Sequence, residues 1–303
     1  MRKAFIDTLT ELSHEDREIY IVSGDAGYGV FEEFVRMYPQ RFINSGIAEA
    51  NMIGYAAGMA LMGFRVFVYN IIPFVLYRCY EQVRNDICYQ DLPVTLIGTG
   101  SGLTYAPQGM THYAIEDLAL TASLPNLTVI SPIDAIETRA AVKFAAQARG
   151  PVYIRLAKTG EPQYRTDGCN DIFSPTIIRD GKDGVVLSYG TVFSEALEAY
   201  DNLVTKDIHI RLVSVPVLQP FPNDAVLELI NGFSTVITLE EHFRNGGLAS
   251  RLTECLVGHS LNVRFVPLAL PNSFIHDVKK QAGMRRHFGI DAAAVMQAVT
   301  ESL

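Results

Sequence analysis

The chain has 303 residues, with 25 Lys and Arg against 33 Asp and Glu, which gives a formal net charge of -8. This acidic balance, together with the lack of a clustered basic stripe, excludes nucleic acid and anionic membranes as expected partners. The length suggests two domains, each able to bury a sizeable core.

The chain shows no signal for export or membrane insertion. Its N-terminal stretch, MRKAFIDTLTELSHEDREIY, lacks the uninterrupted apolar segment of a signal peptide. Only residues 42–64 reach the length of about 18 residues that a membrane helix needs. They include Asn44, Glu49 and Asn51, so we expect burial in protein. The four cysteines are widely spaced without a CxxC pair, which argues against zinc and favours a reduced cytoplasmic protein.

Apolar, β-branched segments alternate with segments of helical spacing in the first half of the chain. The predicted strands lie at residues 19–24, 65–70, 92–98, 127–132 and 151–157. The predicted helices lie at residues 47–62, 74–90, 113–124 and 134–149. This alternation is typical of a parallel sheet that is covered by helices on both faces.

A polar stretch rich in Gly, Pro and Asp, residues 158–184, interrupts the pattern and is interpreted as a linker or irregular excursion. Predicted strands then resume at residues 184–190, 209–215, 234–241 and 263–270. The fold class is therefore α/β, with two doubly wound domains of which the second is smaller. We place the domains at 1–165 and 180–303, with a linker at 166–179.

One carboxylate stands alone in the first domain. Glu49 is the only charged residue between Arg41 and Arg65, and the apolar residues after it cover every side of a helix, which predicts burial all round. An unpaired buried charge costs several kcal/mol or is neutralised through a raised pKa. Two interpretations follow: a functional acid, or a first-turn glutamate in a helix that Asn44 or Ser45 caps.

A second candidate site is the Gly-rich loop at residues 99–120. It follows a buried strand, at the position where α/β sheets place their ligands. Thr111 and His112 open a helix whose N-terminus favours developing negative charge, although a surface histidine is the ordinary alternative. We interpret Glu116 and Asp117 as helix-stabilising acids only.

The remaining motifs carry less information on their own. The stretch at residues 68–89 places aromatic side chains at core spacing on a helix that follows a strand, and its Arg84 and Asp86 would ordinarily be structural. The glycine-containing stretches at 23–29 and 179–184 match neither dinucleotide nor phosphate loops.

Taken in order, these segments resemble the transketolase family. The resemblance rests on GIAEANMIGYAAGMALMG, FVLYRCYEQVRNDICY, GMTHYAIEDLAL and, in the second half, VVLSYGTVFSEAL and TVITLEEHFRNGGLASRL. It spans nearly the whole chain and implies the pyrimidine-binding domain and the C-terminal domain of a thiamin-diphosphate enzyme. The implied reaction moves a two-carbon ketol unit from a ketose donor to an aldehyde acceptor.

The resemblance also implies roles for individual residues. Glu49 would hydrogen-bond N1′ of the cofactor's aminopyrimidine ring and act as the acid-base catalyst, with Phe74 stacked on that ring. Asp25 and Arg78 would complete the cofactor-binding set, and His112 would hydrogen-bond the substrate. Since Glu49 would then pair with a cofactor nitrogen, we expect no protein cation beside it.

The substrate side departs from the usual family pattern. The resemblance assigns a set of side chains to the substrate: Arg2, Ser101, Gln108, His112 and Lys158. Gln108 stands where sugar-phosphate transketolases usually have Asp, Tyr113 stands where they have Gln, and Ser101 replaces a common channel histidine. These changes favour a specialised sugar over an ordinary pentose phosphate.

The family's diphosphate-binding signature, GDG followed by Asn, does not occur in these residues. The resemblance therefore implies an N-terminal partner subunit that holds the diphosphate through Mg²⁺, with no metal on this chain, in an α2β2 assembly. A set of small residues would allow close helix approach to that partner, or equally tight packing inside one domain: Ala48, Ala50, Gly54, Ala57 and Gly58.

Two other functions remain open. The β subunit of a 2-oxo acid dehydrogenase would share the fold and the activating glutamate, and a non-catalytic regulatory subunit would share the fold alone. The TH and EDLA motifs favour transketolase over the first. Retention of Glu49, Phe74 and His112 argues against the second.

Overall fold

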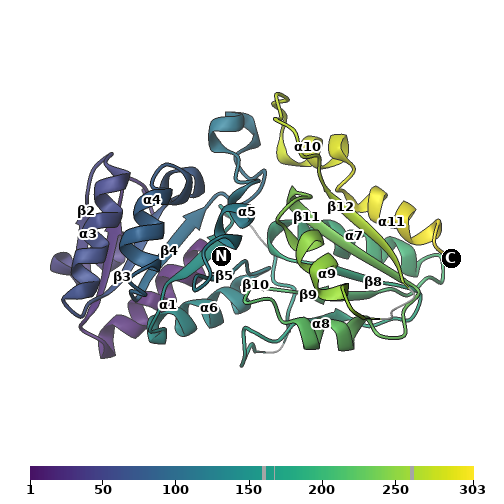
Figure 1. The fold of residues 1–303 in the computed structure, drawn as a ribbon, viewed down its shortest axis with the longest axis horizontal. Helices are drawn as coiled ribbons and strands as arrows, with labels where there is room; N and C mark the ends of the chain where they lie inside the picture. Colours follow the sequence, from purple (N-terminus) through teal and green to yellow (C-terminus); the bar gives the residue numbers. More distant parts are fainter. Residues whose placement is uncertain (159–161, 167, 260–262) are drawn as a thin grey trace.

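The computed structural model describes residues 1–158, 162–166, 168–259 and 263–303, and it contains two α/β domains that lie side by side (Figure 1). Each domain is built on its own sheet with helices on both faces, so the predicted fold class is confirmed. Within the described ranges, no helix has the length and apolar character needed to cross a membrane.

The first domain contains a seven-stranded sheet in the order β10-β5-β6-β4-β3-β1-β2. Its strands are β1 (Ile19–Ser23), β2 (Phe42–Asn44), β3 (Arg65–Ile71), β4 (Val94–Thr99), β5 (Thr128–Ile130), β6 (Val152–Leu156) and β10 (Val217–Gln219). All neighbours are parallel except β10, which runs antiparallel to β5. Because β10 follows strands of the second sheet in the chain, it ties the two domains together.

Apolar side chains cover both faces of this sheet. The helices are α1 (Arg2–Glu15), α2 (Glu32–Met37), α3 (Glu49–Leu61), α4 (Tyr80–Gln82), α5 (Asp117–Ala122) and α6 (Ala135–Gln147), with the π-helical segments η2 (Pro73–Tyr77) and η3 (Val83–Cys88). Along β1, Ile21 packs in the cluster formed with α1, α2 and α6, whereas Val22 packs in the cluster formed with α3, η2 and η3. This alternation is the reason why the parallel strands are apolar throughout.

The second domain contains a five-stranded sheet in the order β12-β11-β8-β9-β7. Its strands are β7 (Thr176–Arg179), β8 (Val185–Ser188), β9 (Arg211–Ser214), β11 (Thr235–Phe243) and β12 (Arg264–Leu270). Its helices are α7 (Phe193–Val204), α8 (Asn223–Ile230), α9 (Leu248–Leu256), α10 (Gln281–Phe288) and α11 (Ala292–Thr300). Val186 faces α7 and α11, whereas Val185 and Leu187 face the core shared with the first domain.

Every strand predicted from the sequence is present, and the structure adds three short edge strands that the sequence does not predict. These are β2, β7 and β10, which have only three or four residues and therefore little pattern to detect. Strand β7 lies inside the polar stretch 158–184 that we interpret as a linker or excursion. Residues 159–161 and 167 of that stretch lie outside the described residues.

The prediction that α3 is buried all round is wrong for this chain. One face of the helix packs on the sheet through Met52, Ile53 and Ala56. On the opposite face Tyr55 is 47% exposed, and at the ends of the helix Ile47 is 78% exposed, Leu61 63% and Met62 70%. The sequence pattern could not separate burial within the chain from an apolar face left open.

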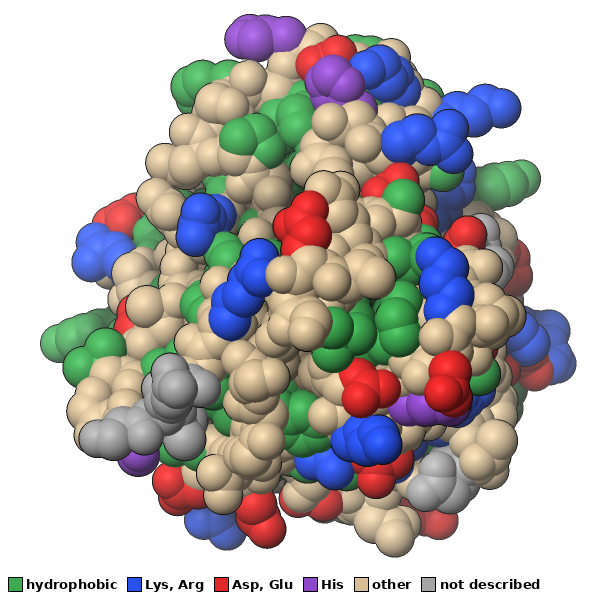
Figure 2. Space-filling model, turned by 90° about the vertical axis from the view of Figure 1, so that its right-hand side faces the viewer, with side chains coloured by type: hydrophobic (Ala, Val, Ile, Leu, Met, Phe, Trp, Pro, Cys, Tyr) green, Lys and Arg blue, Asp and Glu red, His purple; other side chains and the backbone are tan. Residues whose placement is uncertain are grey.

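The outer end of the second domain is of mixed polarity. Figure 2 shows acidic and basic side chains interspersed with apolar ones over this face. On the visible surface, charges of opposite sign lie next to each other. Such an arrangement does not create the extended one-sign field that attracts polyanions.

Candidate active site

The candidate residues gather at the carboxyl edge of the first sheet. They follow successive strands: Asp25 after β1, Glu49 after β2, Phe74 and Arg78 after β3, Ser101, Gln108 and His112 after β4, and Lys158 after β6. The carboxyl ends of parallel strands are where open α/β sheets bind their ligands. The parallel topology therefore brings residues from distant parts of the sequence to one edge.

Glu49 is the first residue of α3 and is 5% exposed. Its carboxylate Oε1 accepts a hydrogen bond from Arg78 Nη1 at 2.7 Å. This ion pair corrects our expectation that no protein cation lies beside Glu49. The helix N-terminus adds a favourable field for the carboxylate.

Neither Asn44 nor Ser45 caps α3. The N-cap residue of the helix is Ala48, which provides no side-chain cap, and Ser45 Oγ instead donates to the Ser23 carbonyl at 3.1 Å. Asn44 and Asp25 form a reciprocal pair, with two hydrogen bonds of 3.1 Å between the amide of Asn44 and the backbone N–H and carboxylate of Asp25. Asp25 therefore sits on a braced loop, with a positive φ of 53°.

Arg78 contacts Phe74 as well as Glu49. The guanidinium carbon lies 4.2 Å from the centre of the Phe74 ring, so the planar cation stacks on the aromatic face while it donates to the carboxylate. A flat nitrogen heterocycle with an N–H donor needs the same two contacts. The site therefore fits the aminopyrimidine ring of thiamin diphosphate, with Glu49 and Phe74 as the groups that would hold it.

A line of ring contacts leads away from Phe74. The His112 ring lies 5.9 Å from the Phe74 ring and 6.2 Å from the Tyr105 ring, both edge-on. Lys158 Nζ lies 5.5 Å from the centre of the Tyr105 ring. The structure thus joins the predicted cofactor residues to His112 and Lys158 through Tyr105, which the sequence reasoning missed because a lone loop tyrosine carries no motif.

The other residues predicted to bind substrate differ in their exposure and position. Gln108 is exposed at the tip of the loop in η4 (Ala106–Gln108), close to η5 (Met110–His112). Ser101 is 1% exposed, so its hydroxyl lies beneath the loop rather than on its surface. Arg2 borders a groove of about 590 Å³ together with Gly29.

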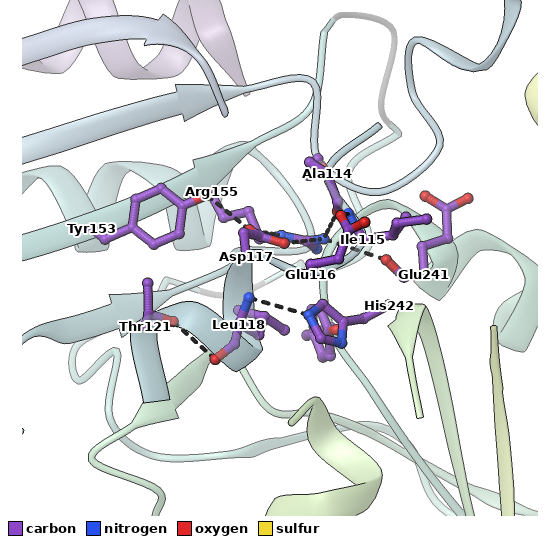
Figure 3. A network of polar contacts seen from close by, with 12 residues as sticks. Ala114, Ile115, Glu116, Asp117, Leu118, Thr121, Tyr153, Arg155, Glu241 and His242 are labelled. Atoms are coloured by element: carbon purple, nitrogen blue, oxygen red, sulfur yellow. Dashed lines mark hydrogen bonds and ion pairs between the residues drawn. The ribbon is translucent and has the colours of Figure 1, made fainter. Parts of the chain in front are cut away.

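The end of the loop is fixed by a buried ion pair, which Figure 3 shows. Arg155 Nε, from β6, donates to Asp117 Oδ2 at 2.7 Å, and the Tyr153 hydroxyl donates to the same carboxylate at 2.8 Å. Both charged side chains are fully enclosed. Asp117 is therefore more than the helix-stabilising acid that we expected, because it anchors the start of α5 to the centre of the sheet.

His242, from β11 of the second domain, caps the same helix. Its Nε2 accepts the Leu118 backbone N–H at 3.2 Å (Figure 3). Its Nδ1 lies 2.7 Å from the Phe243 carbonyl and donates to it. Burial lowers the pKa of His242 to about 4. The ring is therefore neutral near pH 7, as its role as an acceptor requires.

Glu240, two residues earlier, gives a pH-dependent prediction. Its buried carboxylate accepts the N–H groups of Leu248 at 2.7 Å and Ala249 at 2.9 Å, and burial raises its pKa from 4.5 to about 7. The folded state therefore binds a proton that the unfolded state releases. The stability from this group is complete below pH 4.5 and is lost as the pH rises through about 7.

We expect Glu240→Gln to remove this dependence. Between pH 4.5 and pH 8, the wild-type chain should lose about 3 kcal/mol more unfolding free energy than the variant, measured by urea denaturation at several pH values. Glu254→Gln, an exposed acid on α9, serves as the control and should behave like the wild type. Equal pH profiles for Glu240→Gln and wild type would contradict the assignment.

The fold and the site together define a two-domain α/β protein with a carboxylate, an arginine and an aromatic ring at the carboxyl edge of a parallel sheet. Among the described residues, no group of three or more His, Cys, Asp or Glu side chains is placed to hold a metal ion.

Comparisons with known proteins identify the family. The models of the transketolase pyrimidine-binding domain and the transketolase C-terminal domain match residues 1–162 and 176–295. One of the subunits of the apulose-4-phosphate transketolase from Actinobacillus succinogenes is 30% identical over 279 residues, which are 91% of this chain and 89% of the relative. The 6-deoxy-6-sulfo-D-fructose transketolase subunit SqwH from a Clostridium species is 32% identical over 309 residues, which are 99% of this chain and 94% of the relative.

A solved structure agrees in fold over the whole length. A split-gene transketolase, an inactive β4 tetramer, matches with a TM-score of 0.88 and 34% identity, covering 100% of this chain and 97% of that one. The chain therefore belongs to the transketolase family, with its pyrimidine-binding domain followed by its C-terminal domain.

Proposed function

We propose that this chain supplies the acid-base half of a thiamin-diphosphate transketolase that moves a two-carbon ketol unit between specialised sugars. The observation that carries the proposal is the buried Glu49 carboxylate, which lies at a helix N-terminus beside Arg78 and Phe74. A carboxylate beside an aromatic ring can hold a flat, protonatable heterocycle by stacking and hydrogen bonding, and it can exchange a proton with that heterocycle.

Each residue of the site has a distinct task in this proposal. When bound, thiamin diphosphate supplies the carbon nucleophile for ketol transfer. Glu49 holds and moves the proton at N1′ of its aminopyrimidine ring, Phe74 stacks on the ring and excludes water, and Arg78 and Asp25 complete the cofactor-binding set. His112 donates a hydrogen bond to the donor's hydroxyl or developing alkoxide.

We propose that an N-terminal subunit holds the diphosphate through Mg²⁺ and assembles with this chain as α2β2 in the cytoplasm. The names of the relatives, which describe them as transketolase subunits, and the inactive state of the solved β4 tetramer support the need for another chain. All four cysteines are free thiols, as is usual in a reducing compartment.

The exposed face of α3 is the surface that we assign to this partner. Gly54 and Gly58 lie on it, and a Cβ added at either position would meet nothing within 4 Å. Packing inside the chain therefore gives no reason for glycine at these positions, whereas close approach of another subunit would. Ala57 differs, since it packs in the core of its own domain.

This assignment predicts opposite effects on stability and on assembly. The double variant Gly54→Ala, Gly58→Ala should stabilise the purified chain by about 1 kcal/mol per site, because alanine favours the helix. The same variant should weaken association with the N-terminal subunit at least tenfold, measured by calorimetric titration. Gly283→Ala, in α10, is the matched helix control and should leave association unchanged; tight association of the double variant would contradict the interface.

The specialised substrate is supported by the relatives and by the loop. Two relatives are named for apulose-4-phosphate and 6-deoxy-6-sulfo-D-fructose. Exposed Gln108 and Lys158, together with His112, are the side chains that we assign to the sugar. Arg2 and Ser101 remain weaker candidates, because Arg2 borders a groove lined mainly by α1 and α2, and Ser101 is buried.

The test is an assay of the reconstituted two-subunit enzyme with both kinds of substrate. A panel of ketoses with aldehyde acceptors reports ketol transfer, and a panel of 2-oxo acids with lipoyl acceptors reports the dehydrogenase alternative. We expect transfer from ketoses and no acyl transfer to lipoyl groups. Acyl transfer without ketol transfer would favour the dehydrogenase β subunit, and activity unchanged by Glu49→Gln would favour a regulatory subunit.

A further inference from the structure

The Gly-rich loop after β4 contacts the second domain directly. The Leu103 backbone N–H donates to Glu241 Oε2 at 3.2 Å, and Glu241 is the residue of β11 that lies between Glu240 and His242. Gly102 packs against the same carboxylate so closely that a Cβ there would overlap with it, and its φ is +60°. The loop is therefore shaped to receive this side chain.

Glu241 is itself held from three sides by its own domain. It is 2% exposed, and it accepts hydrogen bonds from Arg285 Nε, from Gln281 Nε2 at 3.1 Å and from the Thr191 hydroxyl at 3.2 Å. Arg285 and Gln281 both come from α10. The carboxylate therefore has a fixed position before it meets the loop.

Three further hydrogen bonds hold the end of the loop at the second domain. Arg155 Nη2 donates to the Ala114 carbonyl at 2.6 Å and to the Glu241 carbonyl at 3.3 Å. The Tyr113 hydroxyl, which is fully buried, donates to the Asp277 carbonyl at 2.7 Å. Figure 1 shows the loop beside α10, in agreement with these contacts.

The geometry points to Glu241 as a positioning residue for the substrate loop, an inference that rests on the proposed function. Glu241 acts through the Leu103 N–H, which lies between Ser101 and His112 in the chain, rather than on cofactor or substrate. Glutamine at position 241 has only one acceptor oxygen. With that oxygen on Arg285, its NH2 group faces the buried Leu103 N–H, and the loop must move to pair that N–H. A displacement of about 1 Å at a catalytic group can cost a hundredfold in rate.

The test compares Glu241→Gln with Glu195→Gln in the two-subunit enzyme. Glu195 also pairs with Arg285, at 3.0 Å, and accepts the Ala292 N–H, and both of these partners belong to the second domain rather than to the loop. Both variants weaken the same arginine cluster, so their stabilities should fall together. Only Glu241→Gln should lower kcat/KM for ketol transfer, by at least tenfold, while C2 proton exchange of the cofactor stays within twofold of wild type.

Gly102→Ala provides a second route to the same displacement. The new methyl group pushes on the loop but leaves Glu241, Arg285 and Glu195 intact, and Gly258→Ala, at a φ of +86° with open space around it, controls for backbone strain. We expect Gly102→Ala to reproduce the loss in kcat/KM. Backbone amide exchange at Leu103 should be faster in both loop variants than in either control.

Amide exchange separates the two proposals, because it needs no turnover. If the wild-type complex fails to transfer ketol units, the proposed function is wrong. Faster amide exchange at Leu103 in Glu241→Gln would still support the positioning role of Glu241. Unchanged exchange and kcat/KM in Glu241→Gln, or an equal loss in Glu195→Gln, would overturn the positioning role.

Discussion

Replacing Glu49 by Gln in the two-subunit enzyme should slow C2 proton exchange of thiamin diphosphate by about a hundred- to ten-thousandfold, the usual contribution of a positioned acid or base. Gln keeps the size of the side chain and can still accept a bond from Arg78, but it cannot exchange a proton with N1′. Ketol transfer should fall by the same factor, since it depends on the same activation. Exchange is measured by NMR after dissolution in heavy water and acid quench.

Two controls make the Glu49 result specific. Glu81→Gln removes an exposed acid of α4 that pairs with its sequence neighbours Arg84, at 2.9 Å, and Asn85, and it should leave exchange unchanged. Cofactor binding by Glu49→Gln, followed by near-ultraviolet circular dichroism, should remain within a few-fold of wild type because Phe74 still stacks. An unchanged exchange rate would remove Glu49 from the mechanism.

The second large effect is expected at His112. His112→Ala should spare cofactor binding and C2 exchange, because the ring contacts Phe74 and Tyr105 at their edges. It should lower ketol transfer by about a hundred- to a thousandfold, the cost of removing a donor to developing oxyanion charge. Single-turnover ketol transfer and C2 exchange on the same preparation separate the two steps.

The His112 result has its own control. His209→Ala removes a half-exposed histidine of the second domain that pairs with Asp207 at 3.4 Å, and it should have no effect on either step. If His112→Ala instead lost its fold, or lost C2 exchange in proportion to ketol transfer, the residue would be structural. Tyr105→Phe is a useful companion variant because it keeps the ring that contacts His112.

Much of the architecture could be predicted because it follows from local pattern. The strands that the sequence predicts are continuous apolar runs, such as Ile19–Ser23 and Val94–Thr99, and parallel strands buried on both faces require such runs. Glu49 could also be predicted from local pattern, because it is a single charge inside an apolar segment. The parallel topology then dictates that Glu49, Phe74 and His112 share one edge of the sheet.

Contacts between distant residues could not be predicted in this way. Arg78 is 29 positions from Glu49, and Glu241 is 138 positions from Leu103, so no spacing rule links them. The adjacent acids Glu240 and Glu241 at the end of a buried strand did indicate that long-range contacts exist, because buried carboxylates need hydrogen-bond partners. The exposed face of α3 gave no such signal, since helices that face a partner have the same composition as helices in a core.

In the proposed enzyme, this chain provides catalytic residues to a site that only a second subunit completes. The most direct test titrates a fixed amount of the N-terminal subunit with this chain and follows C2 exchange and ketol transfer together. We predict no activity from either chain alone and a rise in both signals that saturates at one chain per partner. Full turnover by this chain alone, or saturation with no activity, would contradict the claim.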